Sequence, residues 1–245
     1  MILGLIPSRL NSTRLKNKPL LVIDGLPIIV HTFKRAMLSK KLDDVIVCCD
    51  DERIKEVVEK YGGKAVLTSK KHKNGTERIY EYAKKIKSSM VVDIQGDEPL
   101  VDPKDIDQVI SFHKSRKEFD IVVPCMEANE NEVDSRNLVK VVFSKNNKII
   151  YFSRAAVPYR YKDKKIKIYR DLSIVSFKFK ALKAYNSFKQ GKIENIEGIE
   201  LIRAIENNLN LGTFVAKNSG FAVDVNEDLM RAINIMPKDK IRKKY

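Results

Sequence analysis

Tryptophan is absent from this chain of 245 residues, which contains only three cysteines and three histidines. The cysteines, Cys48, Cys49 and Cys125, are odd in number and lack the spacing of metal ligands, which argues against a disulfide framework or a structural zinc site. Each lies in or directly after an apolar run. We therefore expect buried free thiols and a reducing, cytoplasmic compartment.

Long apolar segments are also missing. No run approaches the roughly 20 residues that a helix needs to cross a bilayer, and the short N-terminal apolar segment lacks the basic region of a secretory signal. We expect no membrane insertion. The chain shows no internal repeat or low-complexity linker, and its 43% hydrophobic residues suffice for the core of one α/β domain.

Acidic residues are outnumbered, 32 against 47 lysines and arginines, which gives a net charge of +15. The basic residues are spread along the chain rather than gathered in one stretch. Nucleic-acid binding favours a focused basic face with aromatic or arginine readout positions, and no such motif is present. We therefore expect solvated lysine surfaces that attract anionic substrates, and no nucleic-acid partner.

Apolar runs alternate with segments of helical apolar spacing in the first half of the chain. Strands are expected at residues 2–6, 44–49, 65–67, 90–94 and 121–123, and helices at 27–38, 51–62, 76–87 and 103–114. Thr76 is expected to cap the third helix. This alternation predicts βαβ units and an α/β fold with a Rossmann-like, mainly parallel sheet.

The pattern changes after about residue 126. Residues 139–143 and 149–152 flank a polar segment and predict a hairpin, and a second hairpin-like or extended element is expected over 166–179. Helices are expected at 181–188 and 193–207, and short strands at 213–216 and 221–225. We predict a single domain over 1–245, with an antiparallel insertion at about 126–185 and a mobile basic tail at 238–245.

The segment from Pro7 to Lys18 follows the first expected strand and is rich in arginine, lysine, asparagine and hydroxyl side chains. Loops at the carboxyl ends of strands bind the ligand in open α/β sheets. The residue types suit an anion, above all a phosphate chain. The alternative is an ordinary solvated basic loop.

Gln95-Gly96-Asp97-Glu98-Pro99 follows the strand at 90–94, so its carboxylates are expected at the same sheet edge as the basic loop. A further carboxylate, Asp224, follows the apolar residues 221–223. Mg²⁺ in nucleotide sites binds one or two protein carboxylates and phosphate oxygens. The combination predicts a Mg²⁺–nucleotide site, although either aspartate alone could be a helix cap or turn residue.

Several segments, in order along most of residues 1–230, resemble the cytidylyltransferases that activate 3-deoxy-manno-octulosonic acid (Kdo), the CMP-Kdo synthetase family. They are Arg9 to Leu20, His72 to Arg78, Gln95 to Pro99, Asn137 to Val142, Tyr151 to Ala155 and Val223 to Leu229. The resemblance implies transfer of CMP from CTP to the anomeric hydroxyl of an acidic keto-sugar, with release of pyrophosphate, for synthesis of lipopolysaccharide or another surface polysaccharide. It also implies a homodimer with the insertion at the contact.

The resemblance implies a role for individual residues as well. Arg9, Arg14 and Lys18 would grip the triphosphate and, with Asp97, act in catalysis, while Asp97 and Asp224 would hold Mg²⁺. The nucleotide would also lie against Pro7, Ser12, Asn74, Thr76 and Arg78. The sugar would be bound by Gln95, Arg154, Asp171 and Glu200.

The sugar side departs from the family. Where the family has His-x-Gly-x-Tyr-Gly-Tyr, residues 171–177 place Asp171 for the histidine and Val175 for the first tyrosine. Near Glu200, a family glutamine is also replaced. Lost hydrogen-bond partners discriminate against a polyhydroxylated ligand, so we expect an acceptor that differs from Kdo. Alternatives are a cytidylyltransferase for a sialic-acid-like or other surface sugar, and a weakly active nucleotide-binding homologue.

Overall fold

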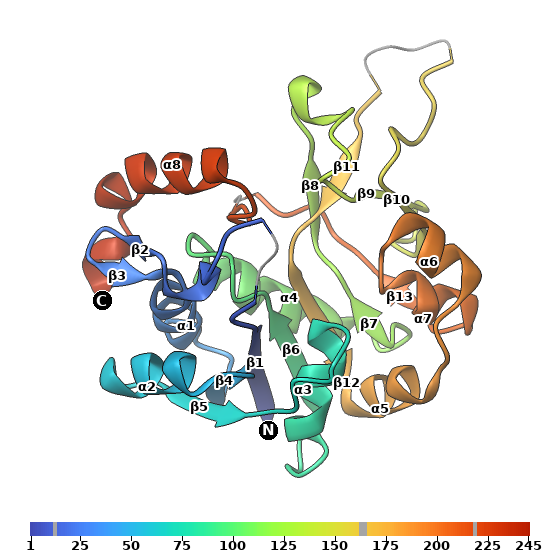
Figure 1. Cartoon of the computed structure of the whole chain (residues 1–245). Coiled ribbons are helices and arrows are strands. Elements are labelled where there is room, and N and C mark those ends of the chain that lie inside the picture. The colour runs from blue at the N-terminus through green and yellow to red at the C-terminus, as the bar shows by residue number, and fades with distance from the viewer. Residues whose placement is uncertain (12–13, 162–165, 218–219) are drawn as a thin grey trace.

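A seven-stranded sheet forms the centre of the molecule (Figure 1). The computed structural model describes residues 1–11, 14–161, 166–217 and 220–245. The strands lie in the order β13-β7-β12-β6-β1-β4-β5. β12 pairs antiparallel with β6 and β7, and the other pairs are parallel, which confirms the mainly parallel sheet. The strands are β1 (Ile2–Ser8), β4 (Asp44–Cys49), β5 (Lys64–Leu67), β6 (Met90–Ile94), β7 (Ile121–Val122), β12 (Ile174–Lys178) and β13 (Leu211–Gly212).

Helices cover both faces of this sheet (Figure 1). Side chains alternate along β1: Ile2 and Ile6 pack with the helices of one face, and Leu3 and Leu5 with those of the other. The first face is covered by α1 (Ile28–Met37), α2 (Glu52–Lys60) and α4 (Pro103–Ser115). The second is covered by α3 (Gly75–Ala83), α5 (Phe179–Ser187) and α7 (Ile202–Glu206), with the short α6 (Lys192–Glu197) leading to α7. The three cysteines are free and buried, as expected.

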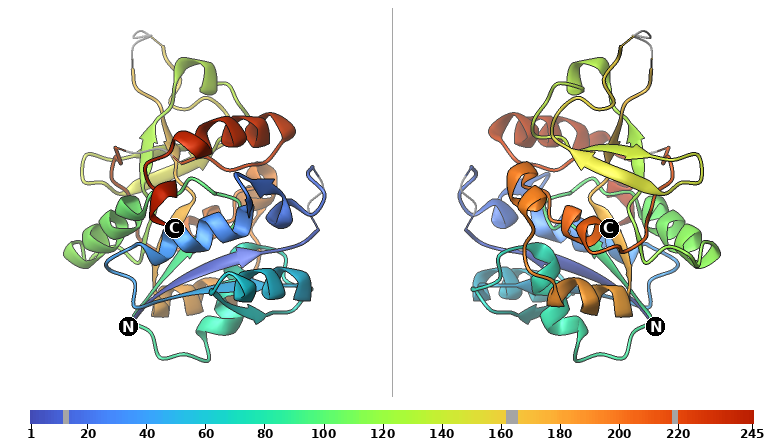
Figure 2. Two further views of the ribbon diagram at one scale, coloured as in Figure 1. Left: turned by 90° about the vertical axis from the view of Figure 1, so that its left-hand side faces the viewer. Right: turned by 90° about the vertical axis from the view of Figure 1, so that its right-hand side faces the viewer.

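A second, antiparallel sheet lies at the end of the molecule opposite the N-terminus (Figure 2). Its order is β10-β9-β11-β8, and β9 and β10 form the expected hairpin. It ends at Asp171, earlier than the expected boundary at 185, because β12 returns to the central sheet. Residues 166–179 therefore form strands of two different sheets. The strands are β8 (Cys125–Glu127), β9 (Lys140–Phe143), β10 (Ile149–Ser153) and β11 (Tyr169–Asp171), with the 3₁₀ turn η2 (Glu130–Glu132) after β8.

The C-terminal segment corrects the expectation of a mobile tail. The Tyr245 hydroxyl lies 2.8 Å from Nδ1 of His31 and accepts a hydrogen bond from Nε of Arg35 at 3.1 Å. His31 and Arg35 are buried polar residues of α1, and buried polar groups need hydrogen-bond partners. The basic sequence of residues 238–245 did not indicate this contact. The segment comprises α8 (Asn226–Ile235), η3 (Met236–Lys238) and η4 (Arg242–Lys244), near η1 (Lys18–Leu20) and the ribbon of β2 (Val22–Ile23) and β3 (Leu26–Pro27).

Three smaller expectations are also corrected. Asn74, not Thr76, caps α3, and its side chain accepts a hydrogen bond from the Glu77 amide at 2.8 Å. Gly198, with φ of +63°, separates α6 from α7, so residues 193–207 are not one helix. Residues 221–225 form no strand. Among the described residues, no helix combines the length and the apolar character that spanning a bilayer requires.

Candidate active site

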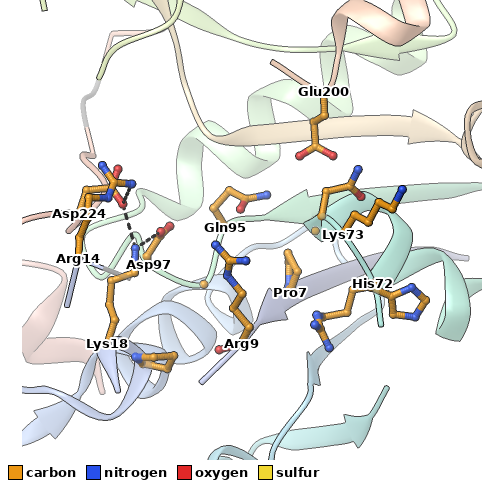
Figure 3. Close-up of a pocket in the computed structure, with 16 residues that line it drawn as sticks. Pro7, Arg9, Arg14, Lys18, His72, Lys73, Gln95, Asp97, Glu200 and Asp224 are labelled. Carbon is orange, nitrogen blue, oxygen red and sulfur yellow. Dashed lines mark hydrogen bonds and ion pairs between the residues drawn. The ribbon is translucent and has the colours of Figure 1, made fainter. Parts of the chain in front are cut away.

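Three parallel strands end side by side at one edge of the central sheet. The register pairs Ser8 of β1 with Cys49 of β4, and Leu5 of β1 with Asp93 of β6, so the loops after these strands meet there. They open on a cavity of about 330 Å³ (Figure 3). Its lining consists of Pro7, Ser8, Arg9, Arg14, Lys18, Pro19, His72, Lys73, Asn74, Gly75, Arg78, Gln95, Gly96, Asp97, Glu200 and Asp224.

At one end of the cavity, two carboxylates share one lysine. Nζ of Lys18 lies 2.6 Å from Oδ2 of Asp97 and 3.0 Å from Oδ1 of Asp224 (Figure 3). A guanidinium nitrogen of Arg14 lies 3.0 Å from the same oxygen of Asp224. Burial opposes the charge on Lys18, but the two carboxylates outweigh it and raise the pKa of the ammonium group. We call Arg14, Lys18, Asp97 and Asp224 the cation–carboxylate cluster.

The two carboxylates come from distant parts of the chain. The Val223 amide donates a hydrogen bond to the Asp97 carbonyl at 2.9 Å, which fixes the segment before α8 against the loop after β6. The Asp228 carboxylate accepts hydrogen bonds from the amides of Asp224 and Val225 at 3.0 and 3.1 Å. These backbone contacts hold Asp224 beside Asp97.

Gly96 allows the loop after β6 to approach β1. A Cβ atom at this position would lie 2.7 Å from the Pro7 carbonyl oxygen, which is too close for any other residue. The Thr32 hydroxyl of α1 donates to the Gly96 carbonyl at 3.3 Å. The tight backbone expected at Gly96 is thus present, and it places Asp97 opposite the basic loop.

Arg78 supports the basic loop from beneath. The arginine is 3% exposed, and its guanidinium donates to the Thr68 hydroxyl at 2.7 Å and to Asp50 at 3.4 Å. The other oxygen of Asp50 accepts from the Leu10 amide at 2.9 Å. The sequence interpretation missed Asp50, although its position directly after a strand at the same edge was a usable signal.

Glu200 belongs to the wall opposite the cation–carboxylate cluster, and Thr76 lies behind it. Burial raises the pKa of Glu200, and hydrogen bonds from Thr76 oppose the rise. Oε2 of Glu200 is buried, and within the described chain it has no hydrogen-bond partner. Thr76 is 2% exposed and lies behind the cavity lining. Glu200 belongs to the cavity lining, although its Oε2 atom is itself closed off from solvent (Figure 3).

Three further acidic side chains near the site are buried. Nε2 of Gln95 donates to Oδ1 of Asp93 at 3.0 Å, and complete burial raises the pKa of Asp93 well above its ordinary value. Burial also raises the pKa of Glu98 to about 7 and that of Asp171 to about 6. With Glu200, we call Asp93, Glu98 and Asp171 the buried acid group.

Not every expected site residue reaches the cavity. Arg154 donates to the carbonyl oxygens of Glu197, Arg136 and Gly198 at 2.9, 2.9 and 3.2 Å. All three nitrogens of its guanidinium group are therefore engaged by the backbone. Asp171 also lies outside the cavity lining, whereas Gln95 and Glu200 belong to it. Ser12 falls outside the described residues.

The residues of β12 that depart from the family pattern lie in the protein interior. Oγ of Ser176 lies 2.7 Å from Nδ1 of His113 on α4, within the protein interior. Phe177 is fully buried and Val175 is 8% exposed, both in the core. Residues 171–177 contribute none of the described cavity lining.

A histidine and a lysine complete the lining near α3. Nε2 of His72 lies 2.5 Å from a carboxylate oxygen of Glu81, which orients the ring. Lys73 adds a cation that the sequence interpretation did not single out, although it lies in the segment from His72 to Arg78 (Figure 3). By contrast, His31 is a buried structural residue, and its ring nitrogens contact the Tyr245 hydroxyl at 2.8 Å and the Ile23 carbonyl at 2.7 Å.

Comparison with known proteins agrees with this geometry. A sequence model described as Cytidylyltransferase matches residues 3–214. The 3-deoxy-manno-octulosonate cytidylyltransferase of Leptospira interrogans (serovar Lai) is 39% identical over 243 residues, covering 98% of this chain and 97% of the relative. The 8-amino-3,8-dideoxy-manno-octulosonate cytidylyltransferase of Shewanella baltica (strain OS185) is 36% identical over 232 residues, and the match covers 93% of this chain and 95% of the relative.

A solved structure, CMP:2-keto-3-deoxy-manno-octonic acid synthetase complexed with CTP, superposes with a TM-score of 0.92 at 29% identity. The match covers 97% of this chain and 98% of that chain. With sequence and structure in agreement over nearly the whole length, the chain belongs to the cytidylyltransferase family, in the group that contains the 3-deoxy-manno-octulosonate enzymes.

Proposed function

We propose that this protein transfers CMP from CTP to the anomeric hydroxyl of an acidic 3-deoxy keto-sugar, Kdo or a close relative of it, and releases pyrophosphate. The cation–carboxylate cluster carries the proposal: Asp97 and Asp224, from distant parts of the chain, share one ammonium group at 2.6 and 3.0 Å beside Arg14. A phosphate-binding loop and paired carboxylates at one sheet edge are what Mg²⁺-assisted nucleotidyl transfer requires.

The carboxylate pair fits Mg²⁺, because the Lys18 ammonium already shows that a cation lies favourably between the two side chains. Among the described residues, no group of three or more His, Cys, Asp or Glu could hold a metal, so the other ligands would be phosphate oxygens and water. When bound, Mg²⁺ would polarise the α-phosphate and lower the pKa of the attacking hydroxyl.

The cations of the loop would act on the triphosphate. Arg9 and Arg14 line the cavity and carry fixed charges, which would stabilise the negative charge that develops on the leaving pyrophosphate. Pro7 and Asn74 form the wall against which the nucleotide would lie. Such reactions need little covalent help from the protein, because positioning and charge stabilisation carry them.

Gln95 and Glu200 would bind the acceptor sugar. Both line the cavity, and the buried Oε2 of Glu200 lacks a protein partner in the described structure. A sugar hydroxyl that reached this oxygen would supply the missing hydrogen bond. A ligand without such a hydroxyl would leave the oxygen unpaired and would bind more weakly.

A panel of acceptors tests this assignment. CTP and Mg²⁺ are incubated with Kdo, 8-amino-3,8-dideoxy-manno-octulosonate and a sialic acid, and pyrophosphate release is measured. The 3-deoxy octulosonates should support release and the sialic acid should not. A sialic acid as the best acceptor would overturn the proposal. Kdo as the best substrate by a wide margin would contradict the narrower expectation, drawn from Asp171 and Val175, that the acceptor differs from Kdo.

We also propose that the chain forms a homodimer through its antiparallel sheet. Large apolar side chains are exposed there, with Tyr159 84% and Ile150 56% accessible. Sedimentation at micromolar concentration should give a dimer, and Tyr159→Glu should shift it toward monomer. A monomeric parent protein would contradict this.

A further inference from the structure

The ammonium group of Lys18 lies where the proposed function needs a metal ion. Its contacts to Asp97 and Asp224 are both within hydrogen-bond distance, and only 13% of the lysine side chain is accessible (Figure 3). With Arg14 also bound to Asp224, the two negative charges of the cluster are balanced by two positive ones. The cluster is therefore complete as an internal set of ion pairs.

The backbone that carries Lys18 is fixed. Lys18 begins η1, where the Leu20 amide donates to the Asn17 carbonyl at 2.9 Å and the Leu21 amide donates to the Lys18 carbonyl at 3.2 Å. Pro19, the next residue, is buried. Movement at this position is thus confined to the lysine side chain, whose four methylene groups allow the ammonium to swing over several ångströms.

Lys18 and Mg²⁺ compete for the same oxygens. Mg²⁺ binds oxygen at about 2.0–2.1 Å and demands near-octahedral geometry, which an ammonium group at hydrogen-bond distance from the same carboxylates obstructs. Two cations in this space would also repel each other. Metal binding therefore requires Lys18 to leave Asp97 and Asp224, and the lysine needs another anion to contact when it does.

Resting on the proposed function, we propose that Lys18 is an exchangeable internal counter-ion of the metal site. Without nucleotide, its ammonium holds Asp97 and Asp224 together and keeps the affinity for divalent cations low. When a triphosphate enters the cavity, the ammonium moves to the phosphate oxygens and frees the two carboxylates. Metal and nucleotide then bind cooperatively, because each favours the same position of one side chain.

Direct measurement of Mn²⁺ binding tests this exchange. Mn²⁺ replaces Mg²⁺ and is followed by electron paramagnetic resonance with the full chain, without nucleotide and with α,β-methylene-CTP, which cannot react. In the absence of nucleotide, Lys18→Met should bind Mn²⁺ about tenfold more tightly than the parent protein, a typical size for coupling between linked sites. The gain in Mn²⁺ affinity on adding the analogue should be correspondingly smaller in the variant.

Two variants separate charge from structure. Lys16→Met removes an exposed lysine of the same loop and should leave nucleotide-free Mn²⁺ affinity unchanged. Lys18→Arg keeps a cation and should keep the affinity low. One outcome would overturn the exchange but keep the metal site: Lys18→Met binds Mn²⁺ no more tightly than the parent protein, while Asp97→Asn abolishes Mn²⁺ binding in the presence of the analogue. If Asp97→Asn has no effect on binding, the metal assignment itself fails and the exchange with it.

Discussion

Two groups of carboxylates at this site lie in opposite settings. In the cation–carboxylate cluster, Asp97 and Asp224 are each 27% accessible and pair with Lys18, and Asp224 also pairs with Arg14. In the buried acid group, Asp93 is 1% exposed and accepts a hydrogen bond from the neutral amide of Gln95. The carboxylates of one group are thus paired with cations, while burial favours the protonated form in the other group.

This difference suits the two groups of carboxylates to different ligands. Charged, cation-paired carboxylates suit a metal ion and a phosphate chain, whose interactions are electrostatic. Buried carboxyl groups with raised pKa values can donate as well as accept hydrogen bonds, which suits sugar hydroxyls. The contrast predicts that one substitution, carboxylate to amide, has large effects in the cluster and small effects in the buried group.

The largest effect is expected at Asp97. Asp97→Asn removes the charge that the metal and Lys18 require, so turnover should fall at least about a hundredfold, on the order of 3 kcal/mol of transition-state stabilisation. Steady-state pyrophosphate release measures this, with circular dichroism to show an intact fold. Asp134→Asn, at an exposed acid, is the control and should be silent. Undiminished activity of Asp97→Asn would remove it from the metal site.

A smaller effect is expected at Glu200. Glu200→Leu keeps the volume but removes the hydrogen-bonding oxygens, including the one that lacks a protein partner in the described chain. The kcat/KM for the acceptor should fall about tenfold, the cost of one hydrogen bond to a buried group, while the KM for CTP changes less than about threefold. Equal losses for both substrates would place Glu200 outside the sugar side.

A pH-dependent effect of similar size is expected at Asp171. Its pKa rises from 3.8 to about 6 on folding because the carboxyl group is buried. The folded state therefore keeps its proton to higher pH than the unfolded state, so this group's contribution to stability is full below about pH 4 and is lost as the pH rises through about 6. Asp171→Asn cannot ionise and should escape this loss.

Urea unfolding at about pH 5 and about pH 7.5 measures the difference. Between these conditions, the free energy of unfolding of the parent should fall by about 1.4 kcal/mol more than that of Asp171→Asn. Asp134→Asn should follow the parent. If the unfolding free energies of the parent and Asp171→Asn change in parallel with pH, burial does not raise the pKa of Asp171.

The smallest effect is expected at Asp93, four positions before Asp97 in the chain. Complete burial raises the pKa of Asp93 well above its ordinary value and so favours the protonated carboxyl group. Asp93→Asn keeps the neutral form that burial favours and the oxygen that Gln95 binds, so activity should stay within about threefold and stability within about 1 kcal/mol. A loss as large as that of Asp97→Asn would mean that both groups of carboxylates are ionic.

The sequence predicted the parts of this molecule that depend on local pattern. Strand–helix alternation located the parallel strands, and residues that follow β1 and β6 were placed at one edge because parallel strands end together. Asp224 was also selected correctly for the cavity, although the strand expected before it does not exist.

What the sequence could not supply depends on long-range contacts. Arg154 was expected at the sugar, but nothing in its local pattern shows that three backbone carbonyls occupy its guanidinium. The docking of Tyr245 on α1 arises from the hydrogen-bonding needs of His31 and Arg35, which lie far away in the chain. The pairing of Ser176 with His113 likewise appears only once β12 and α4 are in contact.

The central claim is that the cation–carboxylate cluster serves cytidylyl transfer to an acidic 3-deoxy keto-sugar. Phosphorus NMR of one reaction containing the protein, CTP, Mg²⁺ and the best acceptor of the panel tests it most directly. We expect pyrophosphate and a sugar–CMP phosphodiester to appear in equal amounts, and omission of the sugar, CTP or Mg²⁺ to abolish both. Unchanged CTP signals in the complete mixture, with a folded protein, would contradict it.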